Sequence, residues 1–128
     1  MSRLIYLDNA ATTKTAPEVV DAMIPYFTEH YGNPSSVYSF ASGNKEVVSR
    51  QREIIAQALG AQANEIYFTA GGSESDNWAL KATAEAYEKK GKHIITTKIE
   101  HHAILHTCEY LEKQRGFEIT YLDVDENG

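Results

Sequence analysis

The sequence predicts an α/β fold: N-terminal helices, followed by the start of a mostly parallel sheet with crossover helices. In the second half of the chain, short apolar runs typical of strands alternate with longer stretches that have the apolar spacing of helices. Gly91 and Gly116 stand directly after two of these stretches, where a glycine commonly ends a helix. Strands and helices that alternate at such short spacings form crossover units, whose strands are parallel.

The first half of the chain is predicted to be mainly helical. Pro17 is well placed as the first residue of a helix, and Pro25 should kink or fray that helix because it has no amide N–H. A second helix is expected over residues 39–59, with Gly60 in the position of a C-cap glycine. Residues 32–36 read as a loop, since an asparagine before a proline disfavours helix.

The remaining elements follow from apolar runs and glycine positions. Strands are predicted at residues 5–7, 65–69, 93–97 and 117–124, a tight turn at 70–73, and helices at 74–90 and 103–114. A parallel sheet normally has several strands, whereas the second half offers only three before the turn signal at 125–128. We therefore expect an incomplete sheet, with residues 1–62 as an N-terminal helical segment and residues 63–128 as the first part of a larger domain.

Composition and charge exclude several classes of protein. Apolar residues make up 42% of the 128 residues, which suits a packed core and argues against disorder. The net charge is −6 and the basic residues are scattered, so we expect neither a nucleic-acid partner nor a membrane partner. Cys108 is the only cysteine, which excludes an internal disulfide and fits a reducing compartment. The N-terminal apolar run is too short for a signal peptide. A soluble, cytoplasmic protein is expected.

A glycine turn directly before a predicted helix is a candidate phosphate site. The first turn of a helix has free N–H groups and a partial positive charge, and Gly71 and Gly72 would let a ligand approach the backbone. Ser73 adds a hydroxyl donor. On residues alone the alternative is equally good: the glycines only make the turn and Ser73 only caps the helix. Glu74 and Asp76 would repel a phosphate beside them, so they must point away from one that binds there.

A cluster of histidines before the next predicted helix is the second candidate. His102 and His106 are four residues apart and would face the same way, as in some metal sites, but no third ligand of clear spacing follows. His101 has a more specific position. It follows the carboxyl end of a predicted parallel strand, where open α/β sheets bind their ligands. We therefore expect His101 and the glycine turn to be neighbours, and we assign no metal site.

Four motifs stand in order along the chain: YLDNAATT at residues 6–13, GNPSS at 32–36, GGSESDN at 71–77 and EHHA at 100–103. They resemble those of cysteine desulfurases of the NifS/IscS type, which are fold-type I pyridoxal 5'-phosphate (PLP) enzymes of the aminotransferase class V family. The resemblance covers essentially the whole chain. The resemblance implies that the chain is the N-terminal portion of such an enzyme, and that residues 63–128 begin its cofactor-binding large domain.

The resemblance also implies an activity. Such enzymes take sulfur from L-cysteine, giving L-alanine and an enzyme persulfide whose sulfur feeds iron–sulfur cluster or thio-cofactor assembly. The implied partners are a sulfur-acceptor or iron–sulfur scaffold protein and, in the full-length protein, a second copy in a homodimer. Residues 9–13 and 33–36 resemble segments that border the substrate entrance and the subunit contact.

Individual residues match the family's cofactor site. Gly72 and Ser73 match its phosphate-binding pair, and His101 matches the histidine that stacks on the pyridine ring and is a candidate for proton transfer. The flat face of an imidazole suits stacking, and its titration near neutrality suits proton transfer. The sequence departs from the family pattern at three positions: Ser73 replaces a common Thr, Tyr38 a common His, and Ala41 a common Gly.

Three essential groups of the family are not found in this chain. The Schiff-base lysine, the aspartate that pairs with the pyridinium nitrogen and the catalytic cysteine of a mobile loop all lie downstream in the family, and no lysine here stands in the lysine motif. Cys108 lies in an apolar helical pattern and reads as a core residue. We therefore expect the 128-residue chain alone to be inactive.

Two other functions stay open at this point. The first is another class V PLP enzyme, such as a selenocysteine lyase or an aminotransferase, although the GNPSS and SDN elements argue against it. The second belongs to a different class: a non-catalytic module that binds phosphate at the glycine turn or a metal at His102 and His106.

Overall fold

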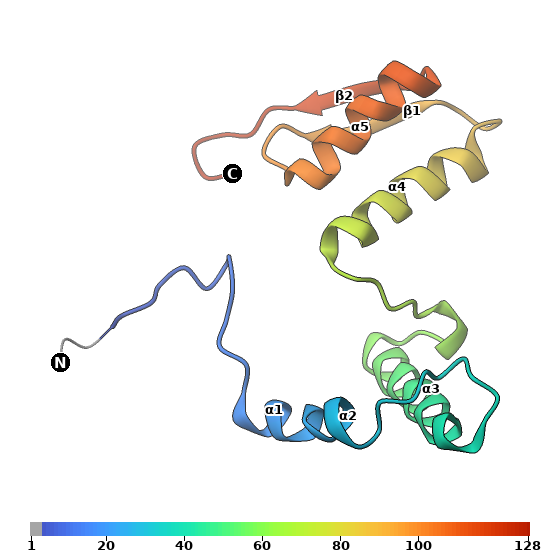
Figure 1. Cartoon of the computed structure of the whole chain (residues 1–128). Helices are drawn as coiled ribbons and strands as arrows, with labels where there is room; N and C mark the ends of the chain where they lie inside the picture. Colours follow the sequence, from blue (N-terminus) through green and yellow to red (C-terminus); the bar gives the residue numbers. More distant parts are fainter. Residues whose placement is uncertain (1–3) are drawn as a thin grey trace. The chain divides into compact units, whose positions relative to one another are not determined.

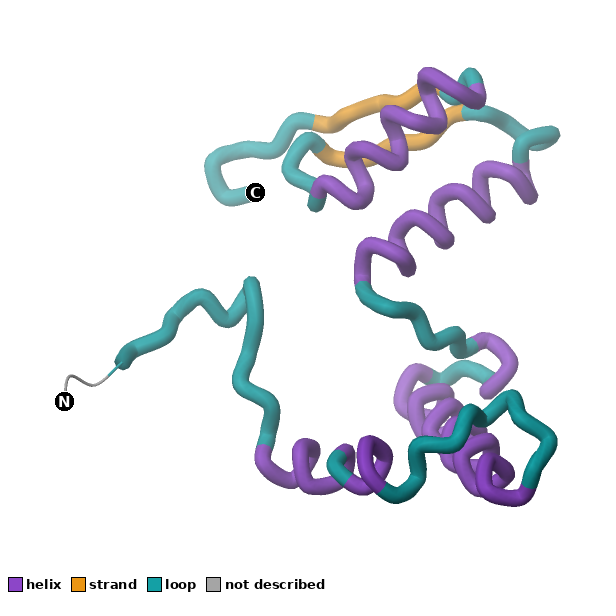
Figure 2. The backbone as a smooth tube through the Cα atoms, in the orientation of Figure 1, coloured by secondary structure: helices purple, strands orange, loops and turns teal. Residues whose placement is uncertain are grey.

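The computed structural model describes residues 4–128, and the chain divides into two compact units, residues 1–67 and 68–128 (Figures 1 and 2). The first unit consists of helices and loops, and the second combines two helices with a sheet. Within residues 4–128, no helix is both long enough and apolar enough to cross a membrane.

Two prolines set the first helices of the first unit. Helix α1 spans Pro17–Met23 and helix α2 spans Pro25–Thr28. Each begins with its proline, at a position where the missing amide N–H costs no helical hydrogen bond. Both predictions are confirmed: Pro17 starts a helix, and Pro25 interrupts it.

The long helix of the first unit, α3, spans Ser39–Leu59, the range predicted from the sequence. Gly60 follows it in the left-handed conformation, with φ of 68°, and its N–H donates to the carbonyls of Ala56 and Gln57. A side chain is strained in this conformation, which explains the glycine. The predicted C-cap at Gly60 is confirmed.

Gly32, in the loop before α3, packs closely against the start of that helix. A Cβ atom built on Gly32 would meet the Cα atom of Ala41 at 3.0 Å and the ring of Phe40 at 3.1 Å. Ala41 is fully buried. The Asn44 amide holds the loop in place by donating to the carbonyls of His30 and Gly32, at 2.6 and 2.5 Å. Close packing therefore favours glycine at residue 32.

We expect Gly32→Ala to destabilise the first unit by about 1–3 kcal/mol, the usual cost of overpacking a well-packed site. Urea denaturation of the 128-residue chain, followed by circular dichroism, measures this change. Gly43→Ala is the matched control, because a Cβ atom at this position within α3 meets nothing within 4 Å and alanine favours helix. Gly43→Ala should leave stability equal or higher. Equal effects of the two substitutions would contradict the packing role of Gly32.

The strands predicted at residues 5–7 and 65–69 are absent from the described structure. A 3-10 helix, η1 at Ala63–Glu65, takes up the start of the second predicted strand. The Glu65 carboxylate accepts a hydrogen bond from the Gln62 N–H at 2.7 Å, so a local capping contact competes with strand formation. A strand also needs a neighbouring strand for its ladder hydrogen bonds, and neither segment has one here. Both predictions are wrong.

The second unit has the predicted alternation of helix and strand. Its elements are α4 at Gly72–Tyr87, β1 at His93–Thr97, α5 at His102–Arg115 and β2 at Glu118–Leu122. The strands pair in parallel, from His93 opposite Glu118 to Thr97 opposite Leu122. The parallel sheet with a crossover helix is confirmed, with two of the three strands predicted for this half. Helix α4 begins two residues earlier than predicted.

Helices α4 and α5 pack together and enclose the apolar core of the second unit with the sheet. The buried members are Ala84 from α4, Leu111 from α5 and Phe117, which directly precedes β2. Leu80, Ile94 and Ile119 pack against them. Gly116 ends α5 with φ of 68°, as its position in the sequence predicts.

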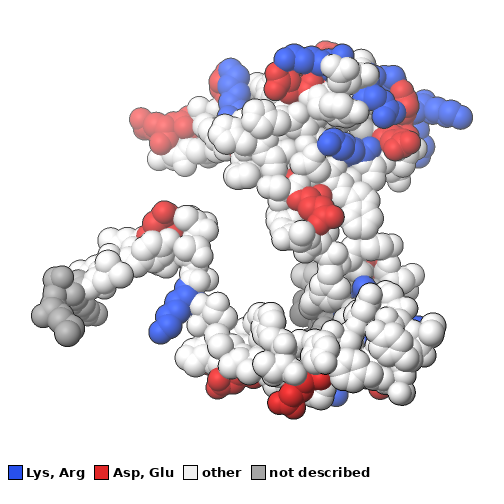
Figure 3. All heavy atoms as spheres, in the orientation of Figure 1, with Lys and Arg blue, Asp and Glu red and all other residues white. Residues whose placement is uncertain are grey.

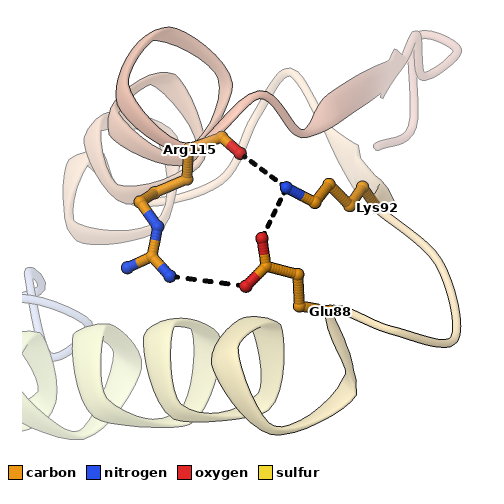
Figure 4. Close-up of polar contacts among 3 residues, drawn as sticks. All are labelled: Glu88, Lys92 and Arg115. Atoms are coloured by element: carbon orange, nitrogen blue, oxygen red, sulfur yellow. Dashed lines mark hydrogen bonds and ion pairs between the residues drawn. The ribbon is translucent and has the colours of Figure 1, made fainter.

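A cluster of charged groups joins the carboxyl ends of α4 and α5 (Figure 4). The Glu88 carboxylate lies 2.5 Å from Lys92 Nζ and 3.6 Å from the Arg115 guanidinium. Lys92 Nζ also donates to the Arg115 carbonyl at 3.2 Å. The hydrogen bond and charge of Lys92 lower the pKa of Glu88. These contacts are exposed, so they orient the helix ends more than they stabilise the fold.

Acidic and basic side chains of the second unit are interspersed on the face that Figure 3 shows. Within the second unit, Lys98 pairs with Asp123 at 2.6 Å, and Lys113 pairs with Glu109. On this face, therefore, no broad area of one sign covers the second unit.

Candidate functional site

The glycine turn forms the N-terminus of α4. Gly71 is the N-cap, with an extended φ of 166°, and no side chain caps the helix. The Gly71 carbonyl accepts hydrogen bonds from the N–H groups of Glu74 and Ser75, at 3.1 and 3.2 Å. Ser73 therefore lies inside the first helical turn. The alternative in which Ser73 serves as the helix cap is wrong.

The donors expected at a helix N-terminus are free. Among the described residues, the N–H groups of Gly72 and Ser73 and the Ser73 hydroxyl make no hydrogen bond. Ser73 is exposed. Unpaired N–H groups at the start of a helix, together with its partial positive charge, favour an anion at this position.

The space over the turn is open because both glycines lack a side chain. A Cβ atom built on Gly71 or Gly72 would meet nothing within 4 Å. Neither residue has a left-handed φ, since Gly71 is extended and the positive-φ glycines are Gly60, Gly116 and Gly128. Neither packing nor backbone strain within the described residues therefore requires glycine here. What the two glycines provide is access to the backbone.

A hydrogen bond within the turn holds the Glu74 carboxylate. This side chain was expected to point away from a phosphate bound at the turn. Glu74 Oε2 accepts a hydrogen bond from the Ala70 N–H at 2.5 Å. This contact fixes the carboxylate on the residue before the glycines, not on the Ser73 hydroxyl. For Asp76, the orientation away from the phosphate stays a prediction.

His101 is the N-cap of α5. Its Nδ1 atom accepts a hydrogen bond from the Ala103 N–H at 3.1 Å. An imidazole nitrogen that accepts a hydrogen bond carries no proton, so Nε2 carries the proton in the neutral ring. The cap therefore fixes both the orientation of the ring and its tautomer, and leaves Nε2 free to donate.

One open hollow brings the two candidates together. It has a volume of about 440 Å³, lies between α4 and α5, and is lined by both Ser73 and His101. The other lining residues are Asn77, Lys81, His102, Ala103, His106, Thr107 and Tyr110. The hollow brings Ser73, at the end of the glycine turn, together with His101. They do not meet at the ends of two neighbouring strands, as expected, because the segment before the glycine turn is not a strand.

His102 and His106 stack on each other instead of converging on a metal. Their ring centroids lie 5.4 Å apart and the rings are inclined by 16°. His106 Nδ1 also lies 3.6 Å from the Glu109 carboxylate. Over residues 4–128, no group of three or more His, Cys, Asp or Glu side chains could hold a metal ion. Within these residues, therefore, His102 and His106 have no third ligand with which to form a metal site.

Cys108 is enclosed on the inner side of α5. Its side chain is 0% exposed, and burial raises the pKa of its thiol, with a smaller contribution from the negative charge of Glu100. Both effects disfavour the thiolate, which is the nucleophilic form. These observations support the interpretation of Cys108 as a core residue.

We expect Cys108 in the folded chain to react far more slowly than an exposed thiol with a thiol reagent such as DTNB at pH 7–8. The physical reason is that the reagent needs both access to the sulfur and a thiolate. The rate of absorbance increase measures it, and the chain unfolded in urea is the control that should react at once. Rapid reaction of the folded chain would contradict this assignment.

Comparison with known proteins decides the family. The family model described as aminotransferase class-V matches residues 5–128. The chain belongs to the aminotransferase class V family. The resemblance found in the motifs is thereby confirmed, and the fold class with it, since solved structures of this kind superpose on the chain.

Several class V relatives are similar over the whole chain. It is 60% identical over 128 residues to "Cysteine desulfurase IscS" of Clostridium botulinum (strain Kyoto / Type A2), covering 100% of this chain and 32% of that protein. It is 58% identical to "Cysteine desulfurase IscS" of Methanosarcina thermophila, covering 99% and 31%. This chain therefore spans about a third of the length of these relatives.

Two solved structures superpose on most of the chain. A "NIFS-LIKE PROTEIN" superposes with a TM-score of 0.82 at 41% identity, over 89% of this chain and 31% of that one. The structure titled "SspA in complex with cysteine" superposes with a TM-score of 0.80 at 42% identity, over 88% and 32%.

Several residues of the hollow were given no role from the sequence, and two of them matter for its geometry. Asn77 and Thr107 line it together with Ser73 and His101. Asn77 stands one helical turn after Ser73, so the spacing of four residues could have placed both on one face of α4. No comparable signal marks Thr107, whose importance depends on a contact with another helix.

Proposed function

We propose that the protein to which this chain belongs is a PLP-dependent cysteine desulfurase, which takes sulfur from L-cysteine and releases L-alanine. The observation that carries the proposal is the shared hollow, in which Ser73 and the ring of His101 lie at two neighbouring helix N-termini. The names of the relatives, and of a neighbour in complex with cysteine, support the same activity and substrate.

The residues present fit the phosphate of PLP. Free N–H groups at Gly72 and Ser73, a free hydroxyl and a space that a Cβ atom would fill are what a phosphate at a helix N-terminus requires. Gly72 and Ser73 would hold the phosphate, and the His101 ring would lie against the cofactor ring. PLP, when bound, supplies an electron sink for carbanion chemistry.

His101 supplies proton chemistry at a defined atom. Because Nδ1 accepts from the Ala103 N–H, the Nε2–H is the hydrogen-bond donor of the neutral ring. To act as a general acid the ring would pass through the imidazolium, with Nδ1 protonated and the Ala103 N–H released, and Nε2 would then give up its proton. His101 lines the open hollow. In this proposal the chain binds the phosphate, orients the ring face and positions one group for proton transfer.

The wider setting follows from the same proposal. The released sulfur would pass as a persulfide to a sulfur-acceptor or iron–sulfur scaffold protein, in a homodimeric and cytoplasmic enzyme. The IscS names of the relatives support the iron–sulfur role.

We expect the 128-residue chain alone to release no sulfide above the rate of free PLP, because none of its lysines stands in the family's lysine motif. The assay incubates the chain with PLP, L-cysteine and a reductant, and measures sulfide and alanine. A full-length enzyme that carries this chain, assayed in parallel, should form both in equal amounts. A keto acid in place of alanine would identify an aminotransferase, and turnover by the chain alone would refute the assignment of the missing groups.

A further inference from the structure

Two consecutive hydrogen bonds connect the first turn of α4 to the buried side of α5. Thr107 Oγ1 donates to Asn77 Oδ1 at 2.8 Å, and Asn77 Nδ2 donates to the Ser73 carbonyl at 2.9 Å. Thr107 is only 2% exposed and Asn77 is half-buried. Both ends of the Asn77 amide are thus engaged, by two different helices, which fixes its orientation.

Each end of this connection leads to a residue of the proposed cofactor site. Ser73, whose carbonyl accepts from Asn77, also carries the free hydroxyl and N–H. Thr107 lies in the helix that His101 caps. The apolar core lies further along α4: Leu80 and Ala84 join it about two and three turns after Ser73. The two hydrogen bonds, and not this core, therefore link α4 to α5 near Ser73.

We propose that Asn77 and Thr107 are positioning residues, which set the place of the Ser73 donors relative to the His101 ring. They touch neither phosphate nor substrate in this role; they act through Ser73 and through α5. The inference rests on the proposed function, because it concerns phosphate bound at Ser73. Its consequence is that the loss of one buried hydroxyl on α5 weakens binding of a phosphate at α4.

Thr107→Val tests the connection, since valine keeps the shape of threonine and removes the donor. In a full-length enzyme carrying this chain, titration of the apo-enzyme with PLP, followed by absorbance, gives the dissociation constant. We expect this constant to rise about three- to ten-fold, the effect of one hydrogen bond of about 1 kcal/mol. Thr107→Ser, which restores the hydroxyl, should restore the affinity. Pyridoxal, which lacks the phosphate, should bind Thr107→Val and Thr107→Ser as well as it binds the parent enzyme.

A double variant and a control separate positioning from general destabilisation. Thr107→Val combined with Ser73→Ala should weaken PLP binding by less than the product of the single effects, because both act on the same contact. Leu111→Val truncates a core residue of α5 outside the hollow, so it should lower the melting temperature yet leave PLP affinity unchanged. Asn77→Ala, at a half-buried site, replaces Thr107→Val if that variant does not fold.

The outcomes distinguish this inference from the proposed function. If Ser73→Ala weakens PLP binding while Thr107→Val and Asn77→Ala leave it unchanged, the positioning role is refuted and the phosphate site stands. An equal loss of PLP affinity in Leu111→Val would also refute the role, since the effect would then be one of stability. If Ser73→Ala and Gly72→Val both leave PLP affinity unchanged, the phosphate assignment fails, and the positioning role fails with it.

Discussion

His101→Asn is expected to leave α5 folded and to abolish most of the turnover of a full-length enzyme carrying this chain. Asparagine is among the best N-cap residues, so its side chain can replace Nδ1 as acceptor of the Ala103 N–H. It has neither an aromatic face nor an acid–base group. General acid–base catalysis by a positioned side chain contributes about 10²–10⁴-fold, and a loss of turnover in this range is expected.

Two further substitutions divide the roles of His101. His101→Phe keeps a ring for stacking, worth about 0.5–1.5 kcal/mol, and should keep much of the PLP affinity while losing turnover. His101→Ala loses ring, proton donor and cap, and should lower affinity, turnover and stability together. Steady-state kinetics, PLP titration and thermal melts of the apo-enzyme measure the three properties separately.

His102→Ala is the matched control for this series. The His102 ring stacks on His106 and does not cap the helix, so the substitution should change turnover little. If His102→Ala is the crippling substitution and His101→Ala is benign, the two neighbouring histidines have been assigned the wrong way round.

The features that the sequence predicted well are those encoded by a few neighbouring residues. Gly60 and Gly116 both adopt a φ of 68°, which favours glycine, so each marks a helix end without knowledge of the rest of the fold. Pro17 marks a helix start for an equally local reason. Both ends of the strand at His93–Thr97 were predicted correctly, because its apolar residues closely follow Gly91, the glycine expected to end the preceding helix.

The features that the sequence missed depend on contacts between distant residues. Residues 65–69 have strand-like composition, but a strand needs a partner, and composition alone does not show whether one is present. The start of α4 was placed two residues late because Gly72 was interpreted as part of a turn, whereas the Gly71 carbonyl accepts from the N–H groups of Glu74 and Ser75, so the helix begins at Gly72. The contact of Asn77 with Thr107 spans thirty positions, so no local pattern reveals it.

The candidate site shows the same division. Motif residues Gly72, Ser73 and His101 could be named from the sequence, and the expectation that they are neighbours follows from the rule that strand ends meet at one edge. The structure brings them together differently, through two helix N-termini that share a hollow. What the sequence could not supply is the state of their donors: a free hydroxyl on Ser73 and a ring of His101 fixed by its own helix.

Gly72→Val should have the second large effect, and it should fall on PLP binding more than on folding. The backbone of Gly72 is not left-handed, and an added Cβ atom meets nothing within 4 Å, so the chain has room for the side chain. Valine in the first helical turn costs well under 1 kcal/mol of helix propensity relative to other common residues. A phosphate that needs this space would be excluded, and binding through the free N–H groups would be lost.

Ser73→Ala removes one donor and leaves the space open, so its effect should be smaller and of defined size. A hydrogen bond to a charged group is worth about 1.5–3 kcal/mol, which corresponds to a loss of PLP affinity of about 10- to 100-fold. Titration of full-length apo-enzymes with PLP measures both variants, and pyridoxal serves as the ligand without phosphate. Pyridoxal should bind Ser73→Ala as well as it binds the parent enzyme. Unchanged PLP affinity in both Gly72→Val and Ser73→Ala would remove the glycine turn from the cofactor site.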